Sequence, residues 1–142
     1  MKKLLLCTVL FFSVTAFANK DLEKAEKAFL QSFPTATDVK WYKDGDMAVV
    51  RFVKDKVTAE LTYDANANIV KTVRYYLEDN LPPMIVAKLK TKYPDKKIFG
   101  VTEIFADERV EYHIVLEDTD RWYDVVCDAY GNSSLKNKFK KA

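Results

Sequence analysis

The stretch DANAN at residues 64–68 recurs as DAYGN at residues 128–132, and each copy closes a run of alternating apolar and polar residues. Alternation with a period of two is typical of a β-strand that buries one face, while Asp, Asn and Gly favour tight turns. Because the copies lie 64 residues apart, the sequence predicts two similar halves, at about residues 19–78 and 79–142.

The first 18 residues have the composition of a secretory signal peptide. Two lysines precede an apolar run over residues 4–14, and AFA at residues 16–18 has the pattern of a cleavage site. The apolar run is shorter than the ~20 residues that a membrane-spanning helix needs, although an uncleaved anchor remains the alternative. We expect cleavage after Ala18, a periplasmic or secreted chain of residues 19–142, and no membrane span in that chain.

The charge distribution argues against a nucleic-acid partner. The sequence has 23 basic and 21 acidic residues, and two of the basic ones leave with the expected leader, so the mature chain is predicted to be near neutral. Lysines gather at positions 136, 138, 140 and 141, but acidic residues are spread over the rest of the chain. A nucleic-acid-binding protein would need a sustained basic stripe, and the sequence has none.

Cys127 and His113 are the candidates for thiol or metal chemistry. Cys127 is the only cysteine beyond the leader, and its place in an alternating run predicts a buried, unreactive thiol. One histidine with one distant cysteine does not make a zinc site. DANAN imitates the start of a calcium loop, but Ile69 and Tyr75 occupy the positions of the required Gly and Glu. We therefore predict no metal and no cofactor.

Each half begins with a helix that a proline ends. In the first half, apolar residues recur at helical spacing up to Phe33 and stop at Pro34; in the second, they recur up to Tyr93 and stop at Pro94. The predicted helix faces consist of Leu22, Ala25, Phe29 and Phe33, and of Ile85, Leu89 and Tyr93. Strands are predicted at residues 39–43, 47–53, 57–64 and 69–76, and at about 98–106, 109–117, 122–128 and 133–139.

The alternation in the middle strands indicates which side of the sheet meets the helices. Residues 57, 59, 61 and 63 are apolar and face inward, and the repeat places 123, 125 and 127 inward as well. Four-residue hairpin loops would set Arg51 opposite Glu60 and Val115 opposite Asp124. Arg51 and Glu60 would then form an exposed ion pair worth only ~0.2–1 kcal/mol.

The predicted fold class is therefore α+β, with two tandem helix-plus-four-strand antiparallel repeats. Both helices would pack on one sheet face and leave the other face open. The pattern leaves undecided whether the two repeats share one continuous sheet.

These patterns resemble the PepSY-like proteins, also described as beta-lactamase-inhibitor-like proteins of bacterial envelopes. The resemblance is carried by the Phe-Pro and Tyr-Pro helix ends, by VEYHIVL at residues 110–116 and by the DAYGN turn, and it covers nearly all of residues 21–139. It implies an exported, non-enzymatic module whose namesakes bind or inhibit other proteins, the inhibitors through their sheet face. The first copy departs from the pattern at Ala67, where the second has Gly131, so we expect Asn66 or Asn68 to supply any left-handed turn residue.

The candidate binding residues all lie on the predicted open face: Arg51, Glu60, His113, Trp122 and Asp124. An outward tryptophan is typical of an interface anchor, unless the chain terminus or the other half covers it. His113 can titrate near neutral pH, but no nucleophile with a partnering base accompanies it. The carboxylate pairs at 44/46 and 118/120 lie in hydrated turns, which do not separate two pKa values as catalysis requires. We predict no catalytic residues.

Three hypotheses of function follow from these observations. The leading one is an exported non-catalytic binding module, either an inhibitor or regulator of another envelope protein or a ligand-binding protein, whose partner would be an envelope protein or a peptide. The second is a self-assembling structural or stress-related envelope protein, because exposed edge strands and near-zero charge favour association. A hydrolase with an unusual site is the third. The ligand, the oligomeric state and the choice between sheet face and loops stay open at this point.

Overall fold

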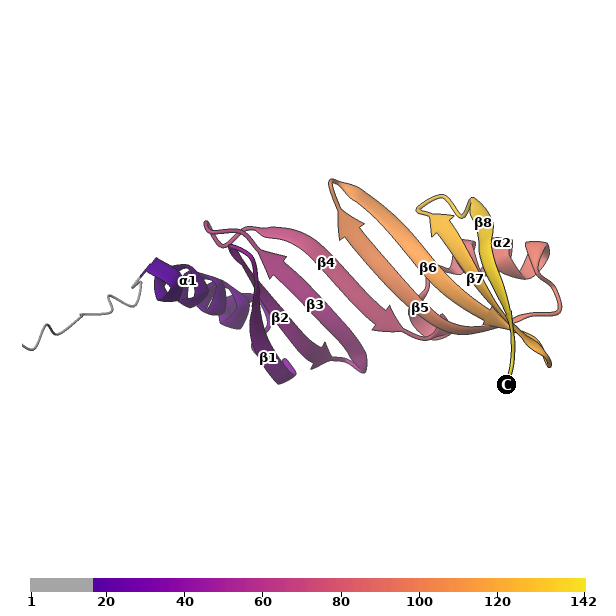
Figure 1. Cartoon of the computed structure of the whole chain (residues 1–142), viewed down its shortest axis with the longest axis horizontal. Coiled ribbons are helices and arrows are strands. Elements are labelled where there is room, and N and C mark those ends of the chain that lie inside the picture. Colours follow the sequence, from indigo (N-terminus) through magenta and orange to yellow (C-terminus); the bar gives the residue numbers. More distant parts are fainter. Residues whose placement is uncertain (1–16) are drawn as a thin grey trace, which may run out of the picture.

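All the strands of the computed structural model pair in the order in which they follow one another along the chain (Figure 1). The structure describes residues 17–142, so the expected leader and its cleavage lie almost wholly outside the described residues. Neither helix of this part combines the length and apolar character needed to cross a membrane. The elements are α1 (Phe17–Ser32), β1 (Thr37–Asp44), β2 (Met47–Lys54), β3 (Val57–Tyr63), β4 (Ile69–Tyr76), the short 3₁₀ helix η1 (Glu78–Asn80), α2 (Pro83–Lys92), β5 (Lys97–Ala106), β6 (Arg109–Glu117), β7 (Arg121–Asp128) and β8 (Ser133–Lys140).

The predicted division into two tandem helix-plus-four-strand repeats is wrong. Residues 71–76 of β4 pair antiparallel with residues 101–106 of β5, so one eight-stranded sheet runs across the expected boundary near residue 78. The physical reason is that two separate sheets would each expose a further edge with unpaired backbone groups. Pairing β4 with β5 removes both of those edges.

The tight hairpins rely on residues in the left-handed region. Asp55 and Lys56, which join β2 to β3, have φ of 50° and 66°, and Asp107 and Glu108, which join β5 to β6, have φ of 50° and 60°. Two-residue loops of this kind match the twist of the flanking strands. The β2–β3 loop is thus shorter than the four residues expected, but the predicted register is confirmed because Arg51 lies opposite Glu60.

The two repeated turns are built by the same hydrogen bonds. Asp64 Oδ1 accepts the N–H groups of Asn66 and Asn68 at 2.9 and 2.8 Å, and Asp128 Oδ1 accepts the corresponding groups of the second turn at 2.9 Å each. Ala67 itself has a φ of 63°, so the expectation that Asn66 or Asn68 would supply the left-handed residue is wrong. The aspartate network holds the turn firmly enough for alanine to adopt this conformation.

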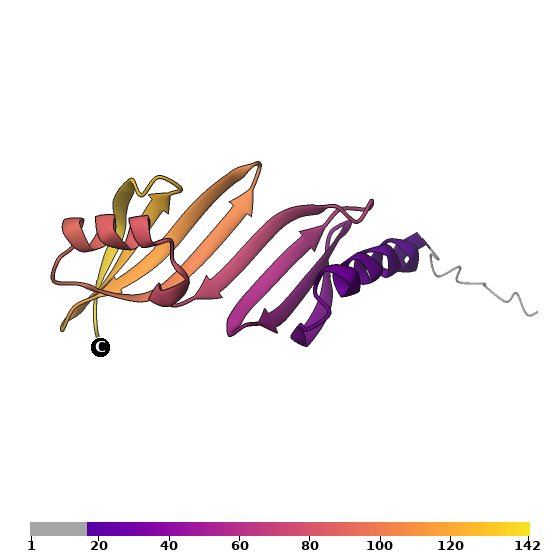
Figure 2. The same ribbon diagram turned by 180° about the vertical axis from the view of Figure 1, so that it is seen from behind.

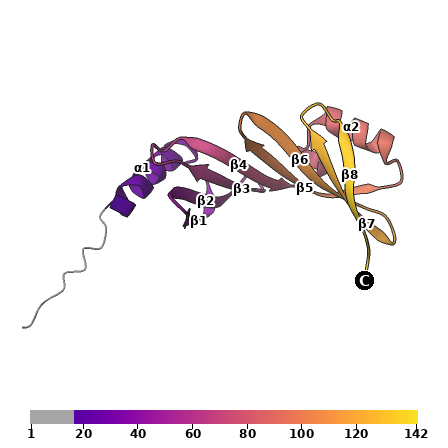
Figure 3. The ribbon, with the colours of Figure 1, turned by 45° about the horizontal axis from the view of Figure 1, so that its top comes forward.

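Both helices lie on the same face of the sheet (Figure 2). The inward-facing residues of β2 and β3 form a core with Ala25 and Phe29 of α1, which are 0% and 1% exposed. At the other end, Ile85 and Leu89 of α2 are 0% and 1% exposed against β5, β6 and β7. Alternation therefore predicted the buried face correctly, and the view in Figure 3 shows both helices on that side of the twisted sheet.

Between the two helices, the same face carries a polar network that joins β4 to β5. Arg74 Nη1 lies 3.0 Å from Glu103 Oε1, and the Tyr76 hydroxyl donates to Glu103 Oε2 at 2.6 Å. Burial, followed by this hydrogen bond, raises the pKa of Tyr76. Because an unpaired carboxylate in a partly buried setting is costly, the network favours the register that places these three side chains together.

Candidate binding face

The open face is the sheet surface opposite the helices, and the strand register defines its members. Side chains alternate across a strand, so each residue between two inward-facing ones lies on this side. The main side chains of the open face are Tyr42, Val49, Arg51, Glu60, Thr62, Val73, Tyr75, Thr102, His113, Val115, Trp122, Asp124, Val126, Asn137 and Phe139. No described helix packs against this surface.

At the β1 end, the open face carries a tyrosine–arginine cluster formed by Tyr42, Arg51, Glu60 and Tyr75. The Arg51 guanidinium lies 5.4 Å from the centre of the Tyr75 ring. Partial burial and then the nearby Glu60 carboxylate raise the pKa of Tyr42 to about 12. The expected Arg51–Glu60 ion pair is not among the ion pairs of the described residues. The correction has a physical reason: Arg51 contacts Tyr75 on β4 and Glu60 lies near Tyr42 on β1, so each side chain has an aromatic partner across the intervening strand.

This cluster stands over a layer of small residues that are already shielded from water. Val49, Thr62 and Val73 belong to the open face by register, yet they are 3%, 9% and 6% exposed. Tyr42 and Tyr75 in the same cluster stay 44% and 37% exposed. The long side chains therefore cover the sheet themselves and present aromatic and charged groups to solvent.

Towards β8, the open face contains a shallow hollow of about 570 Å³. His113 Nε2 lies 2.6 Å from Glu111 Oε1, and Asn137 Nδ2 donates to Asp124 Oδ2 at 3.4 Å. The hollow thus brings together two of the predicted residues, His113 and Asp124. Both lie in an open, hydrated setting, and neither contacts a nucleophile, so the arrangement suits hydrogen bonding to a partner better than bond cleavage.

An aromatic cluster lies at the β8 end and consists of Phe99, Trp122 and Phe139. The ring centres of Phe99 and Trp122 are 4.6 Å apart with their planes at 71°, and Trp122 pairs across strands with Phe139. The ammonium of Lys141 lies 4.4 Å from the centre of the Trp122 ring. Trp122 is therefore half-covered by the chain terminus, whereas Phe99 and Phe139 remain 54% and 51% exposed.

The predicted site residues do not form one cluster. Arg51 on β2 and Trp122 on β7 are five strands apart, which corresponds to about 24 Å at ~4.8 Å per strand. Sequence reasoning missed Phe99 and Phe139. Phe99 lies in a bulge of β5, between Ile98 and Gly100 in the register, and a bulge changes the side on which a residue lies, so a simple alternation cannot find it.

The remaining reactive groups have structural surroundings. Cys127 is 0% exposed, and burial raises the pKa of its thiol, which keeps it protonated. Within residues 17–142, no three His, Cys, Asp or Glu side chains are placed to hold a metal ion. Asp118 accepts the backbone N–H groups of Asp120 and Arg121 at 3.0 and 2.8 Å, so this carboxylate holds a turn rather than facing another acid.

The same fold occurs in solved structures of Bacteroides proteins. A DUF2874 family protein from Bacteroides uniformis aligns with a TM-score of 0.60 over 82% of this chain and 87% of its own, at 16% identity. A BLIP-like protein from Bacteroides fragilis gives 0.61 over 83% and 84%, at 22% identity. A protein from Bacteroides eggerthii described as one of the "putative periplasmic proteins" gives 0.61 over 83% and 87%, at 16% identity. No family model and no curated protein sequence matches the chain.

At these identities, the likeness establishes a shared fold, and a fold by itself does not define a function. The BLIP-like part of the resemblance in the sequence is supported at the level of the fold. The PepSY-like part stays a prediction, because the solved structures named above do not bear on it.

Proposed function

We propose that this chain is an exported, non-catalytic binding module that docks another envelope protein through its open face. The observation that carries the proposal is the pair of exposed aromatic clusters at the two ends of a surface that no described helix covers. Tyrosine, tryptophan and arginine are the residues that dominate protein interfaces. The open face offers all three on a rigid sheet.

The breadth of the open face suits a protein surface rather than a small molecule. Arg51 in one cluster and Trp122 in the other lie five strands apart, about 24 Å at ~4.8 Å per strand, which exceeds the span of a typical ligand pocket. A standard protein interface buries roughly 800 Å² on each partner, and a face of this breadth can supply that area. The fold shared with a BLIP-like protein supports the choice of a protein partner and of an inhibitor or regulator role.

Each predicted residue has a defined part in this proposal. Arg51 and Glu60 would supply charged contacts beside the tyrosines, and Trp122 would support the exposed phenylalanines beside it. His113 and Asp124 line the hollow between the clusters and would accept or donate hydrogen bonds to polar groups of the partner. The periplasm or the cell exterior is the proposed location, as the leader pattern of the sequence suggests.

The experiment is quantitative capture with residues 19–142 from an envelope extract of the source organism, followed by affinity measurement with the captured protein. Tyr75→Ala and Phe139→Ala change one exposed residue in each cluster and should each weaken binding about tenfold. Leu30→Ala and Met84→Ala are the matched controls, because these helical side chains are 65% and 50% exposed. Equal losses from the controls, or unchanged binding in both open-face variants, would argue against the open face.

Self-assembly is the second candidate, because β1 and β8 are unpaired edges of the described sheet. β8 carries three lysines and no acidic residue, so two β8 edges would repel each other if they paired. We therefore favour the binding module. Sedimentation of purified residues 19–142 separates the two candidates: a monomer at all concentrations supports binding of a different protein, and concentration-dependent growth supports assembly.

A further inference from the structure

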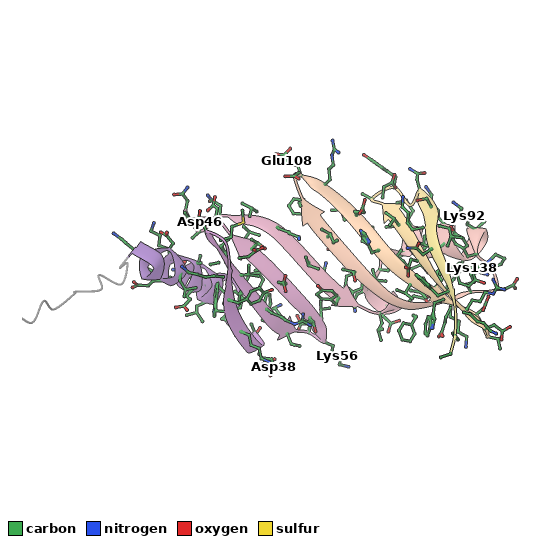
Figure 4. The ribbon with its side chains drawn as sticks, viewed as in Figure 1. Asp38, Asp46, Lys56, Lys92, Glu108 and Lys138 are labelled. Atoms are coloured by element: carbon green, nitrogen blue, oxygen red, sulfur yellow. The ribbon has the colours of Figure 1, made fainter. Side chains whose placement is uncertain are left out.

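A cationic groove runs along the side of the molecule that the open face does not use, between α2 and the edge strand β8. The side chains of Lys88 and Lys92 extend from α2 to the carbonyl oxygens of Tyr130 and Ser133, at the β7–β8 turn. A hollow of about 530 Å³ lies there, lined by Ala87, Lys88, Thr91, Lys92, Gly131, Asn132 and Ser133. Figure 4 labels Lys92 and Lys138 at this end of the sheet.

Lysines of β8 continue the groove on the same face as the helix. Lys138 pairs across strands with the inward-facing Tyr123, and its ammonium lies 5.3 Å from the centre of that ring. Lys140 pairs with Arg121, two residues before Tyr123 and thus on the same face. In the part of the chain that the structure describes, no carboxylate lies within ion-pairing distance of Lys88, Lys92, Lys138 or Lys140. The positive charges of Lys92, Lys138 and Lys140 are therefore available to an external anion, whereas that of Lys88 is shared with the nearby Asp128, whose pKa it helps to lower.

The two edges of the sheet differ in charge. β8 has the sequence SSLKNKFK, with three lysines and no acid, whereas β1 has TDVKWYKD, with two lysines and two aspartates. Protection of an edge against aggregation needs charge but not a single sign. Positive charge that gathers beside a hollow favours binding of a negatively charged partner.

We propose that an acidic, extended segment of another protein binds along β8 as an additional strand. Its backbone would pair with the edge of β8 beyond Ser133, whose carbonyl already accepts from Lys92; this edge has no strand neighbour in the described sheet. Alternate carboxylates would face Lys88, Lys92 and Lys138, because side chains of an added strand alternate between the faces. The intervening apolar side chains would lie beside Phe139, which is 51% exposed on the open face.

The lysine ammonium groups can bond to the backbone carbonyls and bind an external carboxylate at the same time. Each ammonium has three donors, so Lys88 and Lys92 keep donors for a carboxylate after bonding to Tyr130 and Ser133. Gly131 permits this arrangement, since a Cβ there would lie 2.6 Å from Lys88 Cδ. We therefore expect the bound segment to have alternating acidic and apolar residues over about the length of β8.

The test uses a fluorescein-labelled peptide of alternating Glu and Val. The fluorescence anisotropy of this peptide is measured as unlabelled protein, residues 19–142, is added. We expect binding that weakens at least about tenfold when NaCl rises from about 50 to about 200 mM, as expected for ion pairs at a surface. A peptide of the same composition with its glutamates in one block, and one with a central Pro, should bind at least about tenfold more weakly. Amide hydrogen exchange should slow in residues 133–140 when the alternating peptide is bound.

Two variants of the protein locate the site. Lys138→Glu should weaken binding at least about tenfold, because it places a like charge in the groove. Lys43→Glu on β1 is the matched control at the opposite edge and should change binding less than about threefold. Tyr75→Ala lies in the open-face cluster that is remote from β8 and should leave peptide binding unchanged, so it distinguishes a failure of this proposal from a failure of the open-face proposal.

Several results would overturn the proposal. Equal binding of the alternating, block and proline peptides would indicate a nonspecific electrostatic attraction without strand addition. Equal effects of Lys138→Glu and Lys43→Glu would do the same, and absence of binding at about 1 mM peptide would remove any useful affinity. Vesicles of anionic phospholipid that bind more tightly than the peptide, and compete with it, would reassign the groove to a membrane surface.

Discussion

The two ends of the sheet hold their helices with different chemistry. α1 packs through aromatic rings, since Phe29 lies 5.0 Å from Phe52 and 5.6 Å from Trp41 between ring centres. α2 packs through the aliphatic Ile85 and Leu89 and is also tied to the β7–β8 turn by lysines. An apolar stripe at helical spacing is therefore sufficient to place either helix on the sheet. The lysine hydrogen bonds also hold α2 in position relative to the β7–β8 turn, and α2 alone among the described helices has such bonds.

The largest expected effect comes from removing a core side chain at either end. Phe29→Ala should destabilise the fold by about 3–5 kcal/mol, and Leu89→Ala by about 2–5 kcal/mol, because each leaves a cavity among buried residues. Since β4 and β5 join both ends into one sheet, each change should lower the midpoint of a single transition in urea, followed by circular dichroism and by fluorescence. A second, unshifted transition would show that the two ends unfold separately.

The next effect concerns the junction between the ends. Glu103→Ala should cost about 1–3 kcal/mol, since it leaves the Tyr76 hydroxyl without its acceptor and Arg74 without its partner. Glu103→Gln keeps a side-chain oxygen that can accept from Tyr76 and is the matched control, with a smaller loss. Chemical denaturation measures both. Equal stability of the Ala and Gln variants would contradict a role for the hydrogen bonds.

A third comparison uses the two repeated turns, in which reverse substitutions at the equivalent positions 67 and 131 should change stability in opposite directions. Gly131→Ala places a Cβ at φ of 83° and 2.6 Å from Lys88 Cδ, so we expect a loss of about 1–2 kcal/mol. Ala67→Gly relieves a left-handed alanine and should stabilise by a few tenths to about 1 kcal/mol. Thermal and urea midpoints of the two variants test this. A loss of stability in both would mean that the turns differ in more than this position.

Much of the architecture was predictable because it depends on local patterns. Alternation in residues 57–63 fixed the buried face, and the spacing of Leu22, Ala25 and Phe29 located α1. The continuous sheet was not predictable, because the pairing of β4 with β5 joins segments about 30 residues apart and leaves no local signal. Phe99 was missed for a different reason: a bulge shifts the alternation, and nothing in the residue types of β5 marks its position.

The smallest effect concerns the pH dependence that the two turns share. The hydrogen bonds from Asn68 and Asn132 hold the pKa values of Asp64 and Asp128 below their ordinary value of 3.8. A carboxyl whose pKa is lower in the folded state stabilises the fold above its unfolded pKa, and that contribution is lost as pH falls through the folded pKa. Asp64→Asn and Asp128→Asn should therefore lower the urea midpoint at pH 7 and differ less from the parent near pH 2.5. A difference that stays constant between the two pH values, in either variant, would show that ionisation of the aspartate does not hold that turn.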